Sequence, residues 1–231
     1  MAEEKVRRLF LCRHGKTEAN EKRLYCGGMN ETPLSEIGKK QAILLGKALK
    51  NYYGFQGKFI ISSARERARK TSEIISQAFN PSPFILVAES LREIDGGEWE
   101  GKTQKEVQKL YPKECKEWYN GFLKPNFRFP GGESMKEARN RVKYCFEIVK
   151  KIWLGNEDEK NNDLIIVAHS GVNVIILTDI MASEMKTYGF RIFRQDNACV
   201  NIIGFHEKTS WRPEIEIILI NSTHHLSSMA E

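Results

Sequence analysis

A cation, an imidazole and a glycine stand directly after an apolar run near the start of the chain. The run at residues 9–12 ends at Arg13, His14 and Gly15. Two polar residues complete the motif at loop spacing: Thr17 and Asn20. In α/β proteins the carboxyl ends of buried parallel strands hold the ligands. A neutral imidazole is a good nucleophile toward phosphorus, and a fixed cation beside it would hold an anionic substrate.

Two more apolar runs end in polar residues of the same kinds. The run at 164–168 is followed by His169, and the next residues, Ser170 and Gly171, would offer backbone N–H groups to an anion if a helix begins there. The run at 58–62 leads into three arginines: Arg65, Arg67 and Arg69. If these runs are neighbouring parallel strands, two histidines and at least one arginine meet at one edge of a sheet. Planar guanidinium groups clamp phosphoryl oxygens well, so the pattern favours phosphoryl transfer.

The proton chemistry of phosphoryl transfer calls for a carboxyl group. A departing alkoxide needs a proton and an attacking water needs a base, and one carboxyl group can serve both half-reactions. Glu93 follows the apolar run at 84–88, so it too would lie over the strand ends. Neighbouring arginines favour its ionised form, whereas burial and a bound phosphate dianion favour its protonated form. We therefore expect Glu93 to be most competent as an acid when substrate is bound.

Four motifs, in this order, resemble those of the histidine phosphatase superfamily, also called phosphoglycerate mutase-like. They are the nucleophile motif at 13–20, the second arginine motif at 63–71, the acid motif at 91–101 and the second histidine motif at 167–172. The resemblance runs from about residue 6 to residue 226. Arg-His-Gly alone would be weak evidence, whereas four ordered motifs over about 160 residues are specific.

The resemblance implies metal-independent hydrolysis of a phosphomonoester through a phosphohistidine at His14, with no cofactor. The phosphoryl group would be held by four side chains: Arg13, Asn20, Arg67 and His169. Glu93 would protonate the leaving oxygen and then activate water. Three further residues are candidate contacts of the phosphate: Thr17, Ser170 and Gly171. The register of the second arginine motif selects Arg67 rather than Arg65 or Arg69.

Within the superfamily, the chain is most similar to the α-ribazole phosphatase and broad-specificity phosphatase branch. Three segments carry this similarity: 93–101, 129–134 and 221–226. Gly96 stands where a bulky aromatic residue is frequent in that branch, which would open the pocket. The candidate substrates are α-ribazole phosphate, a sugar phosphate, phosphoglycerate and a generic phosphomonoester, and the sequence does not choose among them.

Other functions of the protein, and purely structural roles of single residues, compete with this interpretation. A mutase would return the phosphoryl group to a second hydroxyl rather than to water, and a non-catalytic protein would only bind a phosphorylated ligand. A lone buried histidine is usually structural, but His14 and His169 each stand at a strand end beside glycine, which favours function. Thr17 and Asn20 would otherwise be turn residues, and Ser170 a helix cap.

Strands and helices alternate along the chain, which predicts a three-layer α/β/α sandwich with a largely parallel sheet. Apolar runs predict strands at 6–12, 58–62, 84–88, 164–168, 198–205 and 214–220. Periodicity predicts helices at 35–52, 66–79, 103–120, 133–154 and from 170 onward. Motif residues lie on both sides of the polar linker 155–163, so we expect one domain over 1–231, with an inserted, partly helical lid at about 94–132.

An aromatic stretch follows Glu93 in the sequence. Its members are Tyr111, Trp118, Tyr119, Phe122, Phe127 and Phe129. One interpretation is a small core beneath a long excursion of the chain. The other is a lid that selects leaving groups above the pocket.

The composition favours a globular cytoplasmic protein, and its positive net charge is compatible with a small anionic substrate but does not show one. The 231 residues carry a formal net charge of +6, but Lys and Arg are spread along the chain, which favours a solvated surface over a nucleic-acid-binding face. No apolar stretch approaches the ~20 residues that span a bilayer, and the polar residues 1–5 lead us to expect no signal peptide there. Five cysteines without paired spacing predict reduced thiols. We expect a monomer or homodimer without nucleic acid, membrane or metal as a partner.

Overall fold

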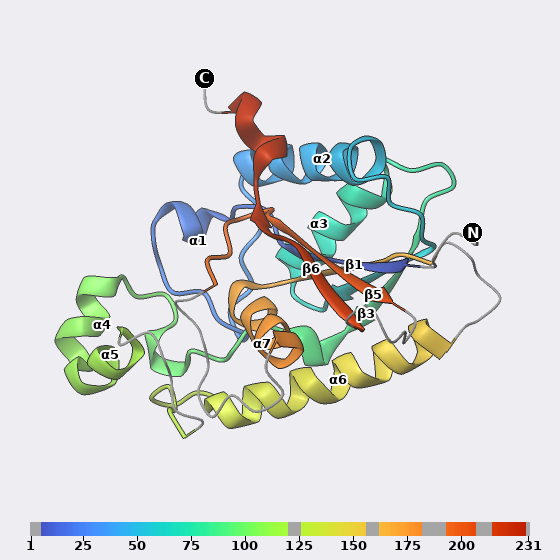
Figure 1. Ribbon diagram of the computed structural model, residues 1–231. Helices are drawn as coiled ribbons and strands as arrows, with labels where there is room; N and C mark the ends of the chain where they lie inside the picture. Colours follow the sequence, from blue (N-terminus) through green and yellow to red (C-terminus); the bar gives the residue numbers. More distant parts are fainter. Residues whose placement is uncertain (1–5, 120–125, 156–161, 182–192, 207–213, 230–231) are drawn as a thin grey trace.

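A six-stranded sheet forms the centre of the protein (Figure 1). The computed structural model describes residues 6–119, 126–155, 162–181, 193–206 and 214–229. The strands are β1 (Val6–Arg13), β2 (Phe59–Ser63), β3 (Phe84–Ala88), β4 (Leu164–Ala168), β5 (Val200–His206) and β6 (Ile215–Ser222). Their order is β3-β2-β4-β1-β5-β6, and the first four run parallel while β5 is antiparallel to both neighbours. The predicted, largely parallel sheet is confirmed.

The pairing register of the central strands brings the motifs together. Arg13 of β1 lies opposite Ala168 of β4, so the histidines that follow these two strands leave the sheet at the same edge. On the other side of β4, Ser62 of β2 lies opposite Val167. The ends of β1, β4 and β2 therefore meet at one place, as expected of parallel strands in an α/β sheet.

Helices cover both faces of the sheet, which makes three layers (Figure 1). The helices α2 (Glu36–Asn51) and α3 (Glu66–Ser76) cover one face, where they pack against Phe10 and Cys12 of β1. The helices α6 (Met135–Gly155) and α7 (Ser170–Met181) cover the other face, where Leu9 and Leu11 point. The alternation of β1 side chains between the two cores follows from the two-residue period of a strand. In the described part of the chain, no helix is both long and apolar enough to cross a membrane.

The predicted helix at 103–120 is two helices in the structure. These are α4 (Gln104–Leu110) and α5 (Pro112–Tyr119), and Tyr111 between them has φ −132° and ψ 59°, outside the helical region. Pro112 has no N–H to donate, and its ring disfavours helical backbone at the preceding residue, so the break is a local effect. Asn120, the last residue of the predicted helix, lies outside the described residues.

The segment after Glu93 lies at one end of the sheet (Figure 1). It contains a cluster of aromatic side chains. Trp99 is fully buried, and its ring meets the ring of Phe129 edge-on at 5.2 Å. The ring centroids of Trp118 and Phe129 are 4.9 Å apart, and the ring of Phe127 packs edge-on against Phe129. These rings belong to a core that continues into α6 and α7, so the predicted small core is present, while Phe122 lies outside the described residues. That 94–132 acts as a lid stays a prediction.

Short helices complete the chain. A single turn, α1 (Glu18–Glu21), follows the nucleophile motif, and three 3-10 turns occur at η1 (Glu89–Leu91), η2 (Gly97–Trp99) and η3 (His224–Met229). The helix α2 begins at Ser35 as expected, because the Ser35 hydroxyl accepts a hydrogen bond from the Gly38 N–H at 3.2 Å.

The first turn of α2 touches the backbone that follows His14. A Cβ atom at Gly38 would lie 1.9 Å from the Lys16 carbonyl oxygen, and a Cβ atom at Gly15 would lie 2.4 Å from the Gly38 carbonyl oxygen. Both contacts are with main chain, which cannot rotate away. Two glycines are therefore required where the nucleophile loop rests on α2.

Replacing Gly38 by alanine tests this contact. Gly38→Ala should lower the free energy of unfolding by roughly 1–3 kcal/mol, because the added methyl group overpacks a main-chain contact. Denaturant titration measures the change. The control is Gly155→Ala, since no atom lies within 4 Å of a Cβ placed there. Equal effects of the two substitutions would contradict the proposed contact.

Candidate active site

The two predicted histidines lie side by side at the edge where β1 and β4 end. The ring centroids of His14 and His169 are 5.1 Å apart, and the ring planes are inclined at 62°. Both side chains are buried, with relative exposures of 4% and 0%. The convergence that the sequence predicts for the two strand ends is therefore present.

The His14 ring is held in one tautomer. Its Nδ1 atom lies 2.7 Å from the Gly15 carbonyl oxygen, which can only accept a hydrogen bond, so Nδ1 carries the hydrogen and Nε2 keeps a lone pair. Burial, followed by the charges of Arg67 and Arg13, lowers the pKa of His14 well below its usual value, against the opposing effect of the Gly15 hydrogen bond. The ring is thus neutral at ordinary pH and has a lone pair on Nε2.

Arg67, which is buried, and Arg13, which is half-buried, lie beside the histidines and bond to backbone carbonyls. Arg67 is only 1% exposed, and its Nη1 and Nη2 atoms donate to the Asn30 and Gly27 carbonyls at 3.0 and 2.9 Å. Arg13 donates through Nη1 to the Gln195 carbonyl at 2.6 Å. The Nε atoms of Arg13 and Arg67 are buried and have no acceptor among the described residues. Each arginine thus keeps a donor that an anion can use.

The other arginines of the second motif point elsewhere. Arg65 forms ion pairs with Glu31 and Glu89, at 3.3 and 2.7 Å. Arg69 is exposed on α3. Of the three arginines, only Arg67 is buried beside the histidines, in agreement with the choice made from the motif register.

The second histidine is fixed by a serine. His169 Nε2 lies 2.8 Å from the Ser63 hydroxyl, and its Nδ1 atom is buried with no partner in the described part of the chain. Burial, then the charges of Arg67 and of other neighbours, lowers the pKa of His169 well below its usual value. His169 therefore stays neutral and has one ring nitrogen unused.

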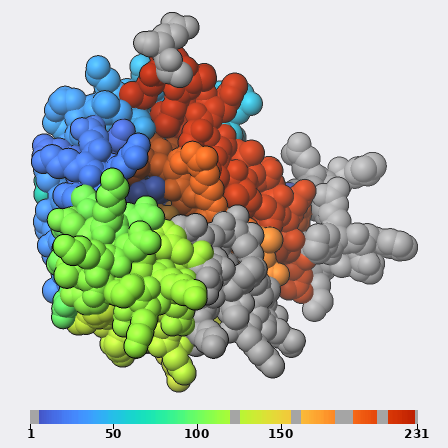
Figure 2. Space-filling view, turned by 90° about the vertical axis from the view of Figure 1, so that its left-hand side faces the viewer, coloured from blue at the N-terminus to red at the C-terminus, as the bar shows by residue number. Residues whose placement is uncertain are grey.

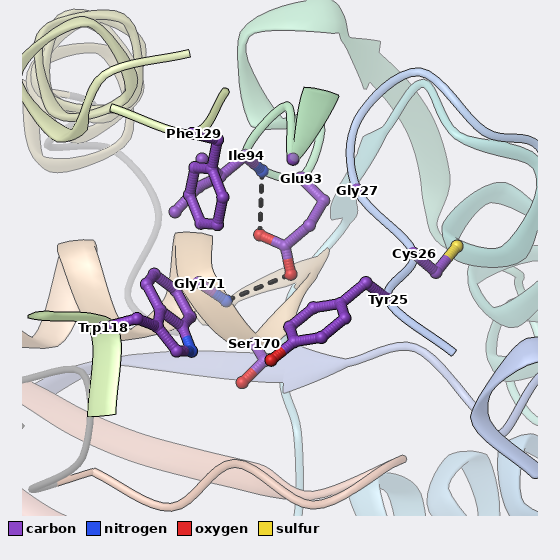
Figure 3. A pocket seen from close by; sticks show the side chains of 10 residues that line it. Tyr25, Cys26, Gly27, Glu93, Ile94, Trp118, Phe129, Ser170 and Gly171 are labelled. Atoms are coloured by element: carbon purple, nitrogen blue, oxygen red, sulfur yellow. Dashed lines mark hydrogen bonds between the residues drawn. The ribbon is translucent and has the colours of Figure 1, made fainter. Parts of the chain in front are cut away.

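Glu93 lies against the first turn of α7 (Figure 3). Its Oε1 atom accepts a hydrogen bond from the Ile94 N–H at 3.0 Å, and its Oε2 atom accepts one from the Gly171 N–H at 3.1 Å. A Cβ atom on Gly171 would lie 2.7 Å from Oε1, so the glycine allows the close approach. The Gly171 N–H, which the sequence analysis assigned to the phosphate, holds this carboxylate instead.

The structure places Thr17 and Asn20 in a helix cap. The Thr17 hydroxyl accepts from the Asn20 N–H and the Asn20 Oδ1 atom accepts from the Thr17 N–H, both at 3.2 Å. Asn197 donates to Asn20 Oδ1 at 3.0 Å and to the His14 carbonyl at 3.4 Å. Thr17 is fully buried in this capping box, while Asn20 is linked to the nucleophile loop.

A pocket of about 180 Å³ opens beside Glu93. Figure 3 shows Glu93 at its wall together with the rings of Tyr25, Trp118 and Phe129. Gly96 lines the same pocket, at the position where a bulky aromatic residue is frequent in the related branch. Neither Lys nor Arg is among the described residues that line it. In Figure 2 this face of the molecule is hollowed between the green segment and the blue and orange segments.

Several residues of the site were not singled out from the sequence. Ser63 holds His169, the Gln195 carbonyl holds Arg13, and Asn197 ties Asn20 to the nucleophile loop. Ser63 ends β2, and the polar run at 194–197 stands just before β5. Polar residues next to apolar strands were therefore the sequence signal that could have pointed to these contacts.

The cysteines form no disulfide. All five are free, and Cys12, Cys115 and Cys199 are buried. Within the described ranges, no group of three or more His, Cys, Asp or Glu side chains is placed to hold a metal ion.

Known proteins share both the sequence pattern and the fold. A family model described as "Histidine phosphatase superfamily (branch 1)" matches residues 9–215. Phosphoserine phosphatase 1 of Hydrogenobacter thermophilus is 30% identical over 220 residues, which cover 95% of this chain and 94% of that protein. The phosphatase PhoE of Bacillus subtilis is 30% identical over 217 residues, covering 94% and 95%. The α-ribazole phosphatase structure from Shigella flexneri has a TM-score of 0.73 at 24% identity, covering 93% and 96%.

The chain therefore belongs to the histidine phosphatase superfamily. The resemblance found in the four motifs is confirmed, and so is the predicted class of enzyme, a phosphatase acting on phosphomonoesters.

The two buried neutral histidines should make stability depend on pH. The pKa values of His14 and His169 lie well below the value of about 6.5 expected in the unfolded chain, so below that pH the unfolded state binds more protons. The free energy of unfolding should be at its full value above about pH 7 and fall as the pH drops from about 6.5 to about 5. Urea titrations across this range measure the slope.

The variants His14→Asn and His169→Asn identify the source of this slope. Each removes up to one proton from the unfolding equilibrium, so each should make the slope shallower by as much as ~1.4 kcal/mol per pH unit. A slope that is the same in both variants and in the parent protein would contradict the assignment.

Proposed function

We propose that this protein hydrolyses a small phosphomonoester through a phosphohistidine at His14, without a metal ion. One observation carries the proposal. The neutral His14 ring, with its lone pair on Nε2, lies among buried groups that have no partner in the described part of the chain: Arg13 Nε, Arg67 Nε and His169 Nδ1. A phosphoryl group bound there would receive hydrogen bonds from these atoms while the nucleophile is at hand.

The reaction has two half-reactions. In the first, His14 Nε2 attacks phosphorus, the bond between phosphorus and the leaving oxygen breaks, and the Glu93 carboxyl gives its proton to that oxygen. In the second, water attacks the phosphohistidine and Glu93 accepts a proton from the water. The phosphorus–nitrogen bond then breaks, which releases inorganic phosphate and returns a neutral ring.

The environment of His169 supports its role as a donor to the phosphoryl oxygens. The Ser63 hydroxyl oxygen accepts a hydrogen bond from the Arg65 N–H at 3.3 Å, and its own hydrogen can donate to His169 Nε2 at 2.8 Å. This hydrogen bond belongs to the tautomer that carries the ring hydrogen on Nδ1. A neutral His169 then donates through Nδ1, and the arginines supply the positive charge.

The pocket beside Glu93 supports a leaving group with an uncharged, ring-like surface. Three aromatic rings contribute to its walls, and the described lining residues offer no cation for a carboxylate. Among the substrates named by the relatives, this favours the α-ribazole phosphate kind over phosphoserine. It also favours hydrolysis over a phosphoglycerate mutase reaction, since phosphoglycerate carries a carboxylate. Free thiols support a cytoplasmic enzyme, and we propose a monomer or homodimer that acts without nucleic acid.

Trapping the covalent intermediate tests the mechanism. After a pulse of substrate labelled in the phosphoryl group and an alkaline quench, the protein should carry a base-stable, acid-labile label on His14. His14→Ala should carry none and lose activity by at least about a thousandfold. His224→Ala is the matched control, because His224 is exposed and far along the chain, and it should behave like the parent protein. An active preparation that never carries label would overturn the mechanism.

A pair of alkyl phosphates tests the role of the pocket. Benzyl phosphate and O-phosphoserine both release an alkoxide that needs a proton, but only O-phosphoserine carries charges on its leaving group. We expect kcat/KM to be at least about tenfold higher for benzyl phosphate.

Trp118→Ala should lower kcat/KM for benzyl phosphate by about tenfold, or ~1.4 kcal/mol. The kcat/KM for O-phosphoserine should stay within about twofold of the parent value. Tyr144→Ala, an exposed aromatic residue on α6, should change neither value. Faster hydrolysis of O-phosphoserine by the parent protein would refute this specificity.

A further inference from the structure

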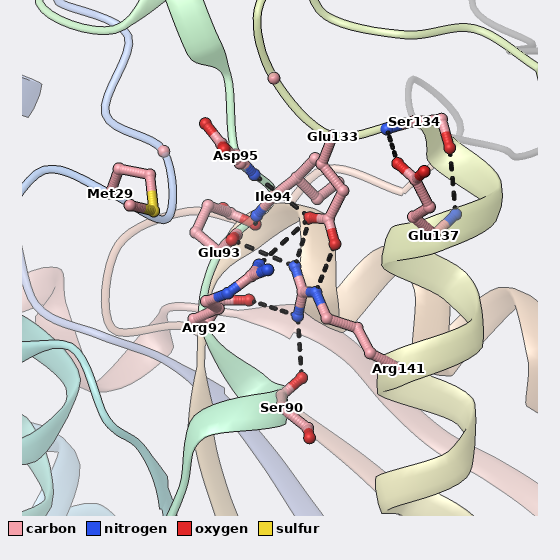
Figure 4. A network of polar contacts seen from close by, with 12 residues as sticks. Met29, Ser90, Arg92, Glu93, Ile94, Asp95, Glu133, Ser134, Glu137 and Arg141 are labelled. Carbon is pink, nitrogen blue, oxygen red and sulfur yellow. Dashed lines mark hydrogen bonds and ion pairs between the residues drawn. The ribbon is translucent and has the colours of Figure 1, made fainter.

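Arg141 of α6 uses every N–H of its guanidinium group near Glu93 (Figure 4). Its Nε and Nη2 atoms donate to the two carboxylate oxygens of Glu133, at 2.7 and 2.8 Å. Its Nη1 atom donates to the Ser90 and Arg92 carbonyls, both at 2.8 Å. Its Nη2 atom also donates to the Glu93 carbonyl at 3.1 Å. One side chain thus binds three carbonyls of the segment that ends at Glu93.

Glu133 binds the same segment both before and after Glu93, at Arg92 and at Asp95. Its Oε2 atom accepts from the Asp95 N–H and from Arg92 Nη1, both at 3.3 Å, and its own N–H donates to the Asp95 carbonyl at 3.0 Å. Burial alone would raise the pKa of Glu133, but the hydrogen bond and charge of Arg141, with the charge of Arg92, outweigh it and lower the pKa. A buried carboxylate that stays ionised is a firm anchor for Arg141.

The backbone of residues 90–95 is also held by the buried side chains of Leu91 and Ile94 and by the Gly28 N–H, which donates to the Ile94 carbonyl at 3.0 Å. The Ser90, Arg92 and Glu93 carbonyls, however, are bound by Arg141. After the 3-10 turn η1 this backbone belongs to no helix or strand until η2. The Glu93 carboxylate is bound to two backbone N–H groups, of Ile94 and Gly171, so its position follows the backbone that carries it. Proton transfer to a leaving oxygen needs hydrogen-bond distance, and a displacement of about 1 Å can cost about a hundredfold in rate.

We propose that the Glu133–Arg141 pair is a positioning device for Glu93, which keeps its carboxyl group at the distance that protonation of the leaving oxygen requires. This inference rests on the proposed function of Glu93. Neither residue touches the substrate; they act through the backbone of 90–95. The consequence is that the proton transfer, rather than phosphoryl binding, depends on this pair.

A second ion pair on the same helix provides a matched control. Arg139 lies two residues before Arg141 and pairs with Asp179 of α7 at 2.7 Å. It is half-buried, as Arg141 is, and it also joins α6 to another element. Its ion pair ties α6 to α7, whereas that of Arg141 ties α6 to the segment that carries Glu93, so its loss tests what a structural ion pair on this helix contributes.

Two substrates separate proton transfer from the rest of the reaction. The leaving group of 2,4-dinitrophenyl phosphate departs as a stable phenolate without a proton, whereas benzyl phosphate releases an alkoxide that must be protonated. The constant kcat/KM reports on steps up to departure of the leaving group, so it isolates the first half-reaction. It is measured for the parent protein and for Arg141→Lys, Glu133→Gln, Arg139→Lys and Glu93→Gln.

Arg141→Lys keeps the charge but loses the fork that reaches Glu133 and three carbonyls. It should lower kcat/KM for benzyl phosphate by about ten- to a hundredfold and that for 2,4-dinitrophenyl phosphate by less than about threefold. Glu133→Gln should change the two values in the same directions, and Arg139→Lys should leave both within about threefold. The retained activity on 2,4-dinitrophenyl phosphate also shows that each variant is folded.

Glu93→Gln separates failure of this inference from failure of the proposed function. If Glu93→Gln lowers kcat/KM equally for both substrates, the acid role of Glu93 is wrong. If Glu93→Gln lowers kcat/KM for benzyl phosphate selectively while Arg141→Lys and Glu133→Gln do not, the positioning role is wrong and the acid role stands. Equal losses on both substrates in Arg141→Lys and Glu133→Gln would likewise overturn the positioning role.

Discussion

The parallel pairing of β1 with β4 is the constraint on which the rest of the site depends. Because Arg13 lies opposite Ala168, the next residue of each strand is a histidine, and the two rings meet 5.1 Å apart. A shift of the register by one residue would turn alternate side chains to the wrong face and would separate the two rings along the strand direction. The two cores on opposite faces of β1 hold this register, since Leu9 and Leu11 fit one core while Phe10 and Cys12 fit the other.

Burial gives this site its electrostatic character. The histidines are kept neutral by desolvation and by the neighbouring arginines, so the positive charge resides on guanidinium groups that cannot lose it. The imidazole lone pairs and the positive charges thereby belong to different residues. The backbone carbonyls of Gly27, Asn30 and Gln195 orient the arginines without neutralising them, which leaves their full charge for an anionic ligand.

Local patterns predicted the strands and the residues at their ends. Apolar runs that stop at His14 and His169 carry both an element and its chemistry in a few consecutive residues, and the structure brings these ends together. Ser63 and Gln195 stand near apolar strands, but the groups that they and Arg141 bind could not be found this way, because each contact spans many residues of sequence. Gly171 shows that a residue type can predict a close approach without predicting its partner. Its type predicted a close approach, but only the fold shows that the approaching group is the Glu93 carboxylate.

The aromatic cluster of the segment after Glu93 belongs at once to a hydrophobic core and to a pocket wall. Trp118 and Phe129 pack on the buried Trp99 and also line the pocket. A mutation that reshapes the pocket by replacing these rings removes packing from the core as well. Evolution of a new substrate preference in this chain is therefore coupled to loss of stability at these positions. Gly96 lines the pocket without belonging to the core, and a Cβ atom there would lie 3.2 Å from Cγ of the Glu100 side chain, so a change at Gly96 asks an adjustment of one partly exposed side chain rather than of the aromatic core.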